Sequence, residues 1–184
     1  MAKKKSIAAP VVLRPFDKED KSIVRVVIET PKHSRNKYKF EPTLSCFVLS
    51  KVLPEGMTFP YDFGFVPSTK GEGGDPIDVL LLMDEPAFPG CIIESRLIGV
   101  IEAEQVEDGK TIRNDRLVAV AKENHKYADL KTLVNVSKTL LKDLEEFFVN
   151  YHRARGSKFK VLGTRGPKQA YGLLDKAAKR SKAA

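Results

Sequence analysis

Acidic residues concentrate in the centre of the chain. Twelve acidic and two basic residues lie within residues 54–108, whereas the whole chain has a formal net charge of +8. The densest acids are in residues 71–78, where Asp75 and Asp78 flank Pro76 and lead into an apolar run. Carboxylates at a rigid turn supply the hard oxygen ligands that suit Mg²⁺ or Mn²⁺, and Mg²⁺ commonly shares its shell with substrate phosphates. Asp, Gly and Pro also favour ordinary turns, so this segment alone is explained as well by a polar turn that caps a strand.

A wider set of polar side chains lies in or beside predicted strands and helices, at positions where an apolar side chain would be easier to bury. The set is Glu29, Lys37, Lys39, Lys51, Asp75, Asp78, Glu102, Glu104, Asp115, Arg116 and Tyr151. By strand alternation Lys37 shares a face with Lys39, and Glu102 shares one with Glu104. Such pairs are more often solvent-facing edges than sites, because charged residues are commonly exposed. A closed barrel is the arrangement that would bring the set together.

Net charge divides the chain unevenly. Residues 1–53 carry +7, residues 54–108 carry −10, residues 109–151 carry +2 and residues 152–184 carry +9. A basic chain often binds nucleic acid. Basic ends around an acidic centre are equally compatible with an anionic ligand that binds through metal ions. Charge alone does not choose between these partners.

The residue types that bind zinc are scattered along the sequence. His33, His125 and His152 stand far apart, so no zinc site is expected. Cys46 and Cys91 each lie in an apolar, strand-like run and are expected to be reduced core residues.

Targeting signals are not expected. Residues 6–10 are too short for the apolar core of a signal peptide, and no apolar run approaches membrane-spanning length. We therefore expect a soluble, cytoplasmic protein with no membrane partner.

The length of 184 residues fits one well-buried domain. Residues 1–10 are expected to form a disordered basic tail and residues 11–184 the single domain. Apolar and β-branched runs between turn signals predict strands at residues 22–29, 37–40, 46–49, 78–83, 90–104 and 116–121. Asp108-Gly109 predicts a hairpin turn between the last two strands, because this dipeptide tolerates positive φ.

The C-terminal third has helical periodicity instead. Apolar residues recur at helical spacing from Val136 to Tyr151, which predicts a helix of about five turns with Asn135 as its N-cap. A second helix is predicted to begin at Gly166-Pro167, because Pro suits the first helical turn. Together these elements predict a mainly β (α+β) fold: a small, closed, OB-like β-barrel with two C-terminal α-helices.

From about residue 23 to residue 163 the sequence resembles the soluble inorganic pyrophosphatases with a small β-barrel, the family I inorganic diphosphatases. The most specific element is Gly-Asp-Pro-Ile-Asp-Val-Leu at residues 74–80, which is similar to that family's acidic signature. Weaker matches follow in the same order along the chain, at residues 26–31, 36–38, 59–67, 117–120 and 147–151. Several ordered matches around one specific motif make chance similarity a poor explanation.

This resemblance implies hydrolysis of inorganic pyrophosphate with Mg²⁺, or Mn²⁺, as cofactor, and it implies a homo-oligomer. Asp78 would bridge metal ions, Asp75 would bind metal and accept a proton from the attacking water, and Glu29 would steady the metal and water network. Phosphate oxygens would be held by Lys37, Lys51, Arg116 and Tyr151.

Some metal-binding positions depart from the family pattern. The acid that the family usually has two residues before Asp75 is Gly73 in this chain, and Glu72 is the candidate substitute. The two acids of the later hairpin fall at Glu104 beside Gln105 and at Asp115 beside Asn114. Other departures from the pattern are Lys39, Lys51, Phe59, Phe63 and His152.

The sequence is therefore interpreted as a Mg²⁺-dependent pyrophosphatase, with two alternatives. The first is a non-catalytic or weakly active relative that binds a phosphate-containing ligand, motivated by the missing acid at Gly73. The second is a barrel-type nucleic-acid binder. Nucleic acid is the less favoured partner, because the aromatic residues cluster at residues 59–65 beside acidic residues instead of among basic ones.

Overall fold

The computed structural model describes residues 13–107 and 109–183. Its elements, in chain order, are β1 Val24–Thr30, β2 Asn36–Glu41, β3 Cys46–Val52, β4 Asp62–Val66, β5 Ile77–Leu82, β6 Ile92–Glu107, β7 Lys110–Arg113, β8 Arg116–Ala121, a 3₁₀ helix Leu133–Asn135, α1 Lys138–Arg153, β9 Lys158–Arg165 and α2 Pro167–Lys182. The tail expected at residues 1–10 lies outside the described residues. Neither α1 nor α2 nor the 3₁₀ helix has the length and apolar content that a membrane span requires.

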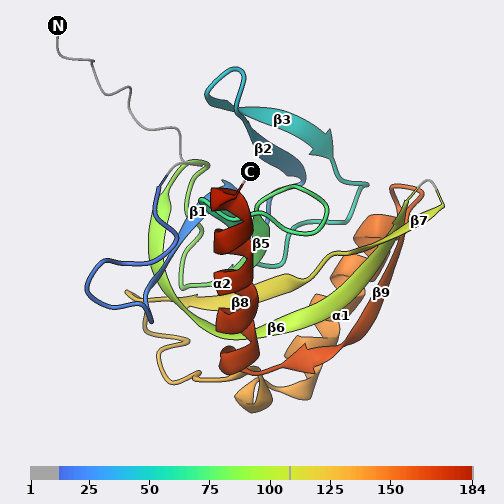
Figure 1. Cartoon of the computed structure of the whole chain (residues 1–184). Coiled ribbons are helices and arrows are strands. Elements are labelled where there is room, and N and C mark those ends of the chain that lie inside the picture. The colour runs from blue at the N-terminus through green and yellow to red at the C-terminus, as the bar shows by residue number, and fades with distance from the viewer. Residues whose placement is uncertain (1–12, 108, 184) are drawn as a thin grey trace, which may run out of the picture.

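Five strands pair in a closed ring (Figure 1). β1 pairs with β4, β4 with β5, β5 with β8, and β8 with β6, which returns to β1. The β5 and β8 pair is parallel, and the other four ring pairs are antiparallel. The 16 residues of β6 are enough to pair with β1 and β8 and then with β7 and β9. The mainly β fold with a sheet that closes on itself and two C-terminal helices, as the sequence predicted, is confirmed.

Side chains of the ring pack into two main clusters. One cluster receives residues from all five ring strands and from the apolar face of α2, including Leu174. The other packs the opposite face of the sheet against α1, where Leu144 is fully buried. Alternation along β5 sends Leu81 to the first cluster and Leu80 to the second. Because both faces of β5 are covered, this strand is a continuous apolar run in the sequence.

β2 and β3 form a separate two-stranded sheet that stands beside the ring (Figure 1). Phe40 of β2 packs with Val27 of β1 and Phe65 of β4, which attaches the hairpin to the ring. The prediction that Cys46 lies in the core is wrong, because β3 exposes this residue on its outer edge, while Cys91 is partly buried. Both thiols are free.

The two helices begin at different kinds of cap. The predicted N-cap at Asn135 is wrong, since Asn135 ends the 3₁₀ helix and the Ser137 side chain accepts from the backbone N–H of Leu140 to begin α1. α2 begins after Gly166 with Pro167 in its first turn, as predicted.

Three observed strands were absent from the predicted set: β4, β7 and β9. In β4, a Cβ on Gly64 would lie 2.0 Å from the carbonyl oxygen of Val27, so only glycine lets β1 and β4 approach this closely. Residue 108 of the predicted hairpin turn lies outside the described residues. The antiparallel strands on either side of it are β6 and β7, and Gly109 has a φ of 73°.

Candidate active site

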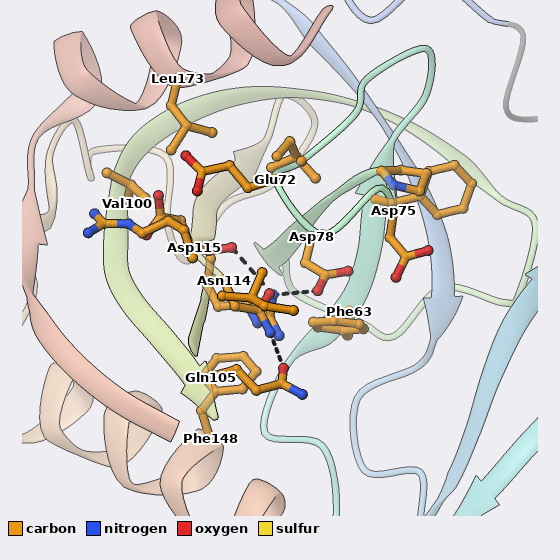
Figure 2. A pocket seen from close by; sticks show the side chains of 18 of the residues that line it. Phe63, Glu72, Asp75, Asp78, Val100, Gln105, Asn114, Asp115, Phe148 and Leu173 are labelled. Atoms are coloured by element: carbon orange, nitrogen blue, oxygen red, sulfur yellow. Dashed lines mark hydrogen bonds and ion pairs between the residues drawn. The ribbon is translucent and has the colours of Figure 1, made fainter. Parts of the chain in front are cut away.

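A single large pocket collects most of the predicted site residues. Its volume is about 1060 Å³, and it is lined by β5, β6, β7, the end of α1 and one face of α2 (Figure 2). Among the predicted residues, those that line it are Glu29, Lys37, Glu72, Asp75, Asp78, Asp115, Arg116 and Tyr151. Lys51 and Glu104 do not line it. The pocket therefore joins acids from the centre of the sequence to cations from the N-terminal hairpin and β8.

Asp78 and Arg116 form the central ion pair of the pocket. Their neighbours Val79 and Leu117 are register partners in the parallel β5 and β8 pair, so Asp78 and Arg116 enter their strands side by side. Arg116 Nη1 lies 2.5 Å from Asp78 Oδ2, and the Arg116 side chain is 6% exposed while that of Asp78 is 28% exposed. A cation this deeply buried requires an anionic partner, and Asp78 supplies it.

The turn before β5 holds Asp75 and Glu72 at the surface of the pocket. The backbone N–H of Gly71 donates to the carbonyl of Asp75 at 2.7 Å, and Gly74 adopts the left-handed φ of 94° that closes the turn. Both carboxylates are exposed. In Figure 2 the Glu72 carboxylate is directed toward the Leu173 side of the pocket and Asp78 lies on the opposite side.

Glu29 lies at the end of β1 in the pocket wall. Its carboxylate accepts from the backbone N–H of Phe40 at 2.9 Å. Burial raises the pKa of Glu29 to about 7, and the nearby charges of Asp78 and Asp75 add to this rise, while the Phe40 N–H and Lys37 oppose it. Glu29 is therefore close enough to both aspartates to sense their charge.

Lys37 enters the pocket over aromatic rings. Its Nζ lies 5.2 Å from the centroid of Phe63 and 5.6 Å from that of Tyr151. Tyr151 is buried near the end of α1, and its hydroxyl accepts from Arg155 Nη1 at 3.3 Å. Cationic and hydroxyl donors thus lie in the same pocket as the carboxylates.

The β6 and β7 hairpin places an amide pair in the pocket. Asn114 Nδ2 donates to Gln105 Oε1 at 2.5 Å, and Arg116 Nη1 donates to Asn114 Oδ1 at 2.5 Å (Figure 2). Asp115, in contrast, accepts from the backbone N–H of Ala103 at 3.0 Å and from Arg113 Nε at 2.7 Å. Asp115 lines the pocket but is already bound, and burial raises the pKa of its carboxyl group.

In the sequence, Gln105 and Asn114 stand out only as neighbours of Glu104 and Asp115, the acids expected to bind metal. A signal for Gln105 was present, because Ala103 is a core residue and strand alternation gives Gln105, not Glu104, the same face as Ala103. No comparable signal was present for Asn114, because residues 114–115 lie between strands, and its contact with Arg116 is known only from the structure.

In the sequence, His152 is only one of the positions that depart from the family pattern. It is 1% exposed, its Nδ1 lies 3.1 Å from Ser157 Oγ, and its ring stacks on Phe159 with centroids 4.7 Å apart. Burial lowers the pKa of His152 to about 3, and the positive charge of Arg116 contributes. The imidazole is therefore neutral near pH 7.

The donor set suits a shared cation site. Within the part of the chain that the structure describes, no three or more His, Cys, Asp and Glu side chains gather closely enough to hold a metal ion. Mg²⁺, however, is usually bound by one or two carboxylates together with waters and substrate phosphates. Asp75 and Asp78 fit that mode, and the pocket does not form a closed cage of protein ligands.

Comparison with known proteins agrees with this geometry. The family model for inorganic pyrophosphatase matches residues 26–182. The inorganic pyrophosphatase of Nostoc sp. is 36% identical over 157 residues, which is 85% of this chain and 90% of the relative. That of Synechocystis sp. is 32% identical over 87% of this chain and 92% of the relative. The crystal structure of the Thermus thermophilus inorganic pyrophosphatase superimposes with a TM-score of 0.86 at 31% identity, covering 95% of this chain and 99% of that one. The chain belongs to the inorganic pyrophosphatase family.

Proposed function

We propose that this protein hydrolyses inorganic pyrophosphate to two phosphates in a reaction that depends on Mg²⁺, for which Mn²⁺ can substitute. The observation that carries the proposal is that one pocket holds the carboxylates of Asp75, Asp78 and Glu29 together with the cations Lys37 and Arg116. Pyrophosphate is an anion that needs cationic donors, and its hydrolysis needs a proton acceptor and a divalent cation close by. The pocket supplies cationic donors for the anion and carboxylates that would accept the proton and hold the cation.

The cationic and hydroxyl donors have the role of holding the substrate. Lys37 and Arg116 would donate charge-assisted hydrogen bonds to phosphate oxygens, and Tyr151 would add its hydroxyl. Lys51 would act from the neighbouring strand as a supporting charge. Phosphoryl transfer depends mainly on positioning and charge stabilisation, which these donors provide.

The carboxylates have the role of preparing the water. Mg²⁺ held by these carboxylates would supply charge neutralisation for the leaving phosphate and lower the pKa of a water. Asp78 would be its principal protein ligand, and Asp75 would bind it and accept the proton of the attacking water. The water oxygen bonds to one phosphorus, the bridging P–O bond breaks, and two phosphates leave. Glu72, Asp115 and Glu104 would contribute at most outer contacts to this cation.

A direct assay tests the proposal. Purified protein is mixed with pyrophosphate at fixed pH, with Mg²⁺, with Mn²⁺ or with EDTA, and released phosphate is measured colorimetrically. We expect release with either cation and none with EDTA. Binding of pyrophosphate without release under any of these conditions would contradict hydrolysis and leave only a phosphate-binding role.

The proposal extends to the setting of the protein. We infer a single domain over residues 11–184, a homo-oligomer and a cytoplasmic location. Sedimentation of the purified chain measures the oligomeric state directly.

A further inference from the structure

Arg116 occupies an unusual position between two acceptors in the protein without substrate. Its Nη1 contacts both Asp78 Oδ2 and Asn114 Oδ1 at 2.5 Å. Its guanidinium carbon lies 5.3 Å from the ring centroid of Phe148 and 5.7 Å from that of Phe159. The aromatic rings fix the plane of the guanidinium, so the group is aimed at the carboxylate proposed to bind the cation.

The same guanidinium keeps an unused donor. Arg116 Nε is buried and has no hydrogen-bond partner among the described residues. A buried unpaired N–H is costly, and a planar guanidinium binds phosphate best through two parallel N–H donors. A phosphate oxygen pair would give Arg116 a second anionic partner and satisfy Nε.

The β6 and β7 side of the pocket adds little to the cation site proposed at Asp75 and Asp78. On the β6 and β7 side, the polar groups nearest Arg116 are the amides of Asn114 and Gln105, which are hydrogen-bonded to each other. Neutral amide oxygens bind divalent cations more weakly than carboxylates, because they carry no charge to offset that of the ion. Asp115 is already bound by Arg113 and a backbone N–H.

We propose that Arg116 acts as an exchangeable partner: it holds Asp78 in the free protein and moves to pyrophosphate oxygens when substrate binds, which releases Asp78 for the divalent cation. This inference rests on the proposed function. Cation and pyrophosphate then bind cooperatively, and part of the coupling comes from Arg116 and not from direct contact between the two ligands. By linkage, each ligand must tighten the other by the same factor.

The coupling between cation and pyrophosphate binding can be measured without turnover. The readout is Mn²⁺ binding, followed by the loss of the free Mn²⁺ signal in electron paramagnetic resonance. Wild-type protein is titrated alone and with methylenediphosphonate, whose P–C–P bridge does not hydrolyse. We expect weak Mn²⁺ binding by the free protein and tighter binding with the diphosphonate. Because the diphosphonate itself binds Mn²⁺, the wild-type result requires comparison with variants.

Arg116→Gln is the informative variant and Arg155→Gln its matched control. Arg155 is another pocket cation, but it donates to the Tyr151 hydroxyl and not to a carboxylate. We expect free Arg116→Gln protein to bind Mn²⁺ about tenfold more tightly than wild type, and the tightening by diphosphonate to shrink by a similar factor. Arg155→Gln should change Mn²⁺ affinity by less than about threefold, because the charge that it removes lies farther from the cation site than that of Arg116.

Two results would overturn the proposal: equal Mn²⁺ affinities for the two variants, or unchanged coupling in Arg116→Gln. Circular dichroism checks that Arg116→Gln is folded. If Arg116→Gln is not folded, Asn114→Asp gives a second test. The new carboxylate lies beside Arg116, so it competes with Asp78 for the guanidinium and also offers the cation a charged ligand. Mn²⁺ must therefore bind the free variant more tightly than wild type. These measurements use no hydrolysis, so a protein that fails to release phosphate yet shows the Arg116 effect would refute the proposed function and not this inference.

Discussion

Lys37 and Lys51 are direct partners across the antiparallel β2 and β3 pair, yet Lys37 alone of the two lines the pocket. Directly opposite residues in an antiparallel pair share a face and have nearby Cβ atoms, so like charges at these positions disfavour the hairpin. Lys37 directs its Nζ over the rings of Phe63 and Tyr151 in the pocket, so a bound anion would contact Lys37 more closely than Lys51.

Lys37→Ala should impair pyrophosphate use more than Lys51→Ala. We expect KM for pyrophosphate to rise about tenfold or more for Lys37→Ala, because a charge-assisted bond is lost, and about threefold for Lys51→Ala. Steady-state phosphate release against pyrophosphate concentration measures both values. Equal effects would show that Lys51 reaches the substrate as closely as Lys37.

Asp75→Asn and Asp78→Asn should separate proton transfer from cation binding. Asp75→Asn should lower kcat by about 10²-fold to 10⁴-fold, the range typical of a lost general base. Asp78→Asn should also shift the Mg²⁺ concentration for half-maximal rate upward by about tenfold, because a charged ligand becomes neutral. Mg²⁺ titrations of the rate compare the variants, and a kcat unchanged by Asp75→Asn would remove it from proton transfer.

Glu29→Gln should stabilise the protein at alkaline pH. The folded-state pKa of Glu29 is raised to about 7 from 4.5, so between these values the folded state keeps a proton that the unfolded state has lost. The unfolding free energy of wild type therefore falls as pH rises through this window, by about 3 kcal/mol, and the full penalty remains above pH 7. Glu29→Gln removes the penalty.

Urea unfolding of both proteins at pH 4.5 and pH 8 measures this difference. We expect the stability gain of the variant over wild type to be small at pH 4.5 and largest at pH 8. A gain that does not depend on pH would mean that Glu29 ionises in the folded state as it does in water.

Gly73→Asp should strengthen Mg²⁺ binding without straining the turn. A Cβ on Gly73 would meet only the Ile112 side chain, at 3.7 Å, and the left-handed φ belongs to Gly74 instead. An added carboxylate next to Asp75 should lower the half-saturating Mg²⁺ concentration by about tenfold. The companion Glu72→Gln should raise it if Glu72 contributes, and Mg²⁺ curves for both variants that superimpose on wild type would exclude this turn from the cation site.

Gly64→Ala tests the closure of the ring. The new Cβ would fall 2.0 Å from the Val27 carbonyl oxygen, so we expect a loss of unfolding free energy of about 3 kcal/mol. The control is Gly172→Ala in α2, where nothing lies within 4 Å of the added Cβ and helix propensity predicts a gain of about 0.5–1 kcal/mol. Thermal unfolding compares the variants, and equal stabilities would show that β1 and β4 can separate without cost.

Local signals in the sequence were enough for some parts of the fold and site. Asp75 and Asp78 could be placed because a turn and a buried strand follow each other within a few residues. The start of α2 was equally local, since Pro167 marks the first turn by its own φ. The start of α1 was not, because Asn135 and Ser137 are both good caps and the choice depends on burial of Val136 against the sheet.

Long-range pairing decided the rest. β9 alternates lysine with apolar residues and reads as an exposed segment until its pairing with β6 is known. The choice between Glu104 and Gln105, and between Asp115 and Asn114, depends on which side chains β6 and β8 turn toward Arg116. No local pattern fixes that choice for Asn114, because residues 114–115 lie between strands.

The β2 and β3 hairpin forms a sheet separate from the closed ring, so the two parts of the pocket wall can differ in mobility. Asp78 and Arg116 belong to β5 and β8, whose backbone amides pair within the closed ring, so exchange of these amides with solvent deuterium should require near-global unfolding. Amides of the hairpin that carries Lys37 can open without breaking that ring. The hairpin that carries Lys37 is therefore the part of the pocket wall that can shift relative to Asp78 and Arg116 without opening the ring.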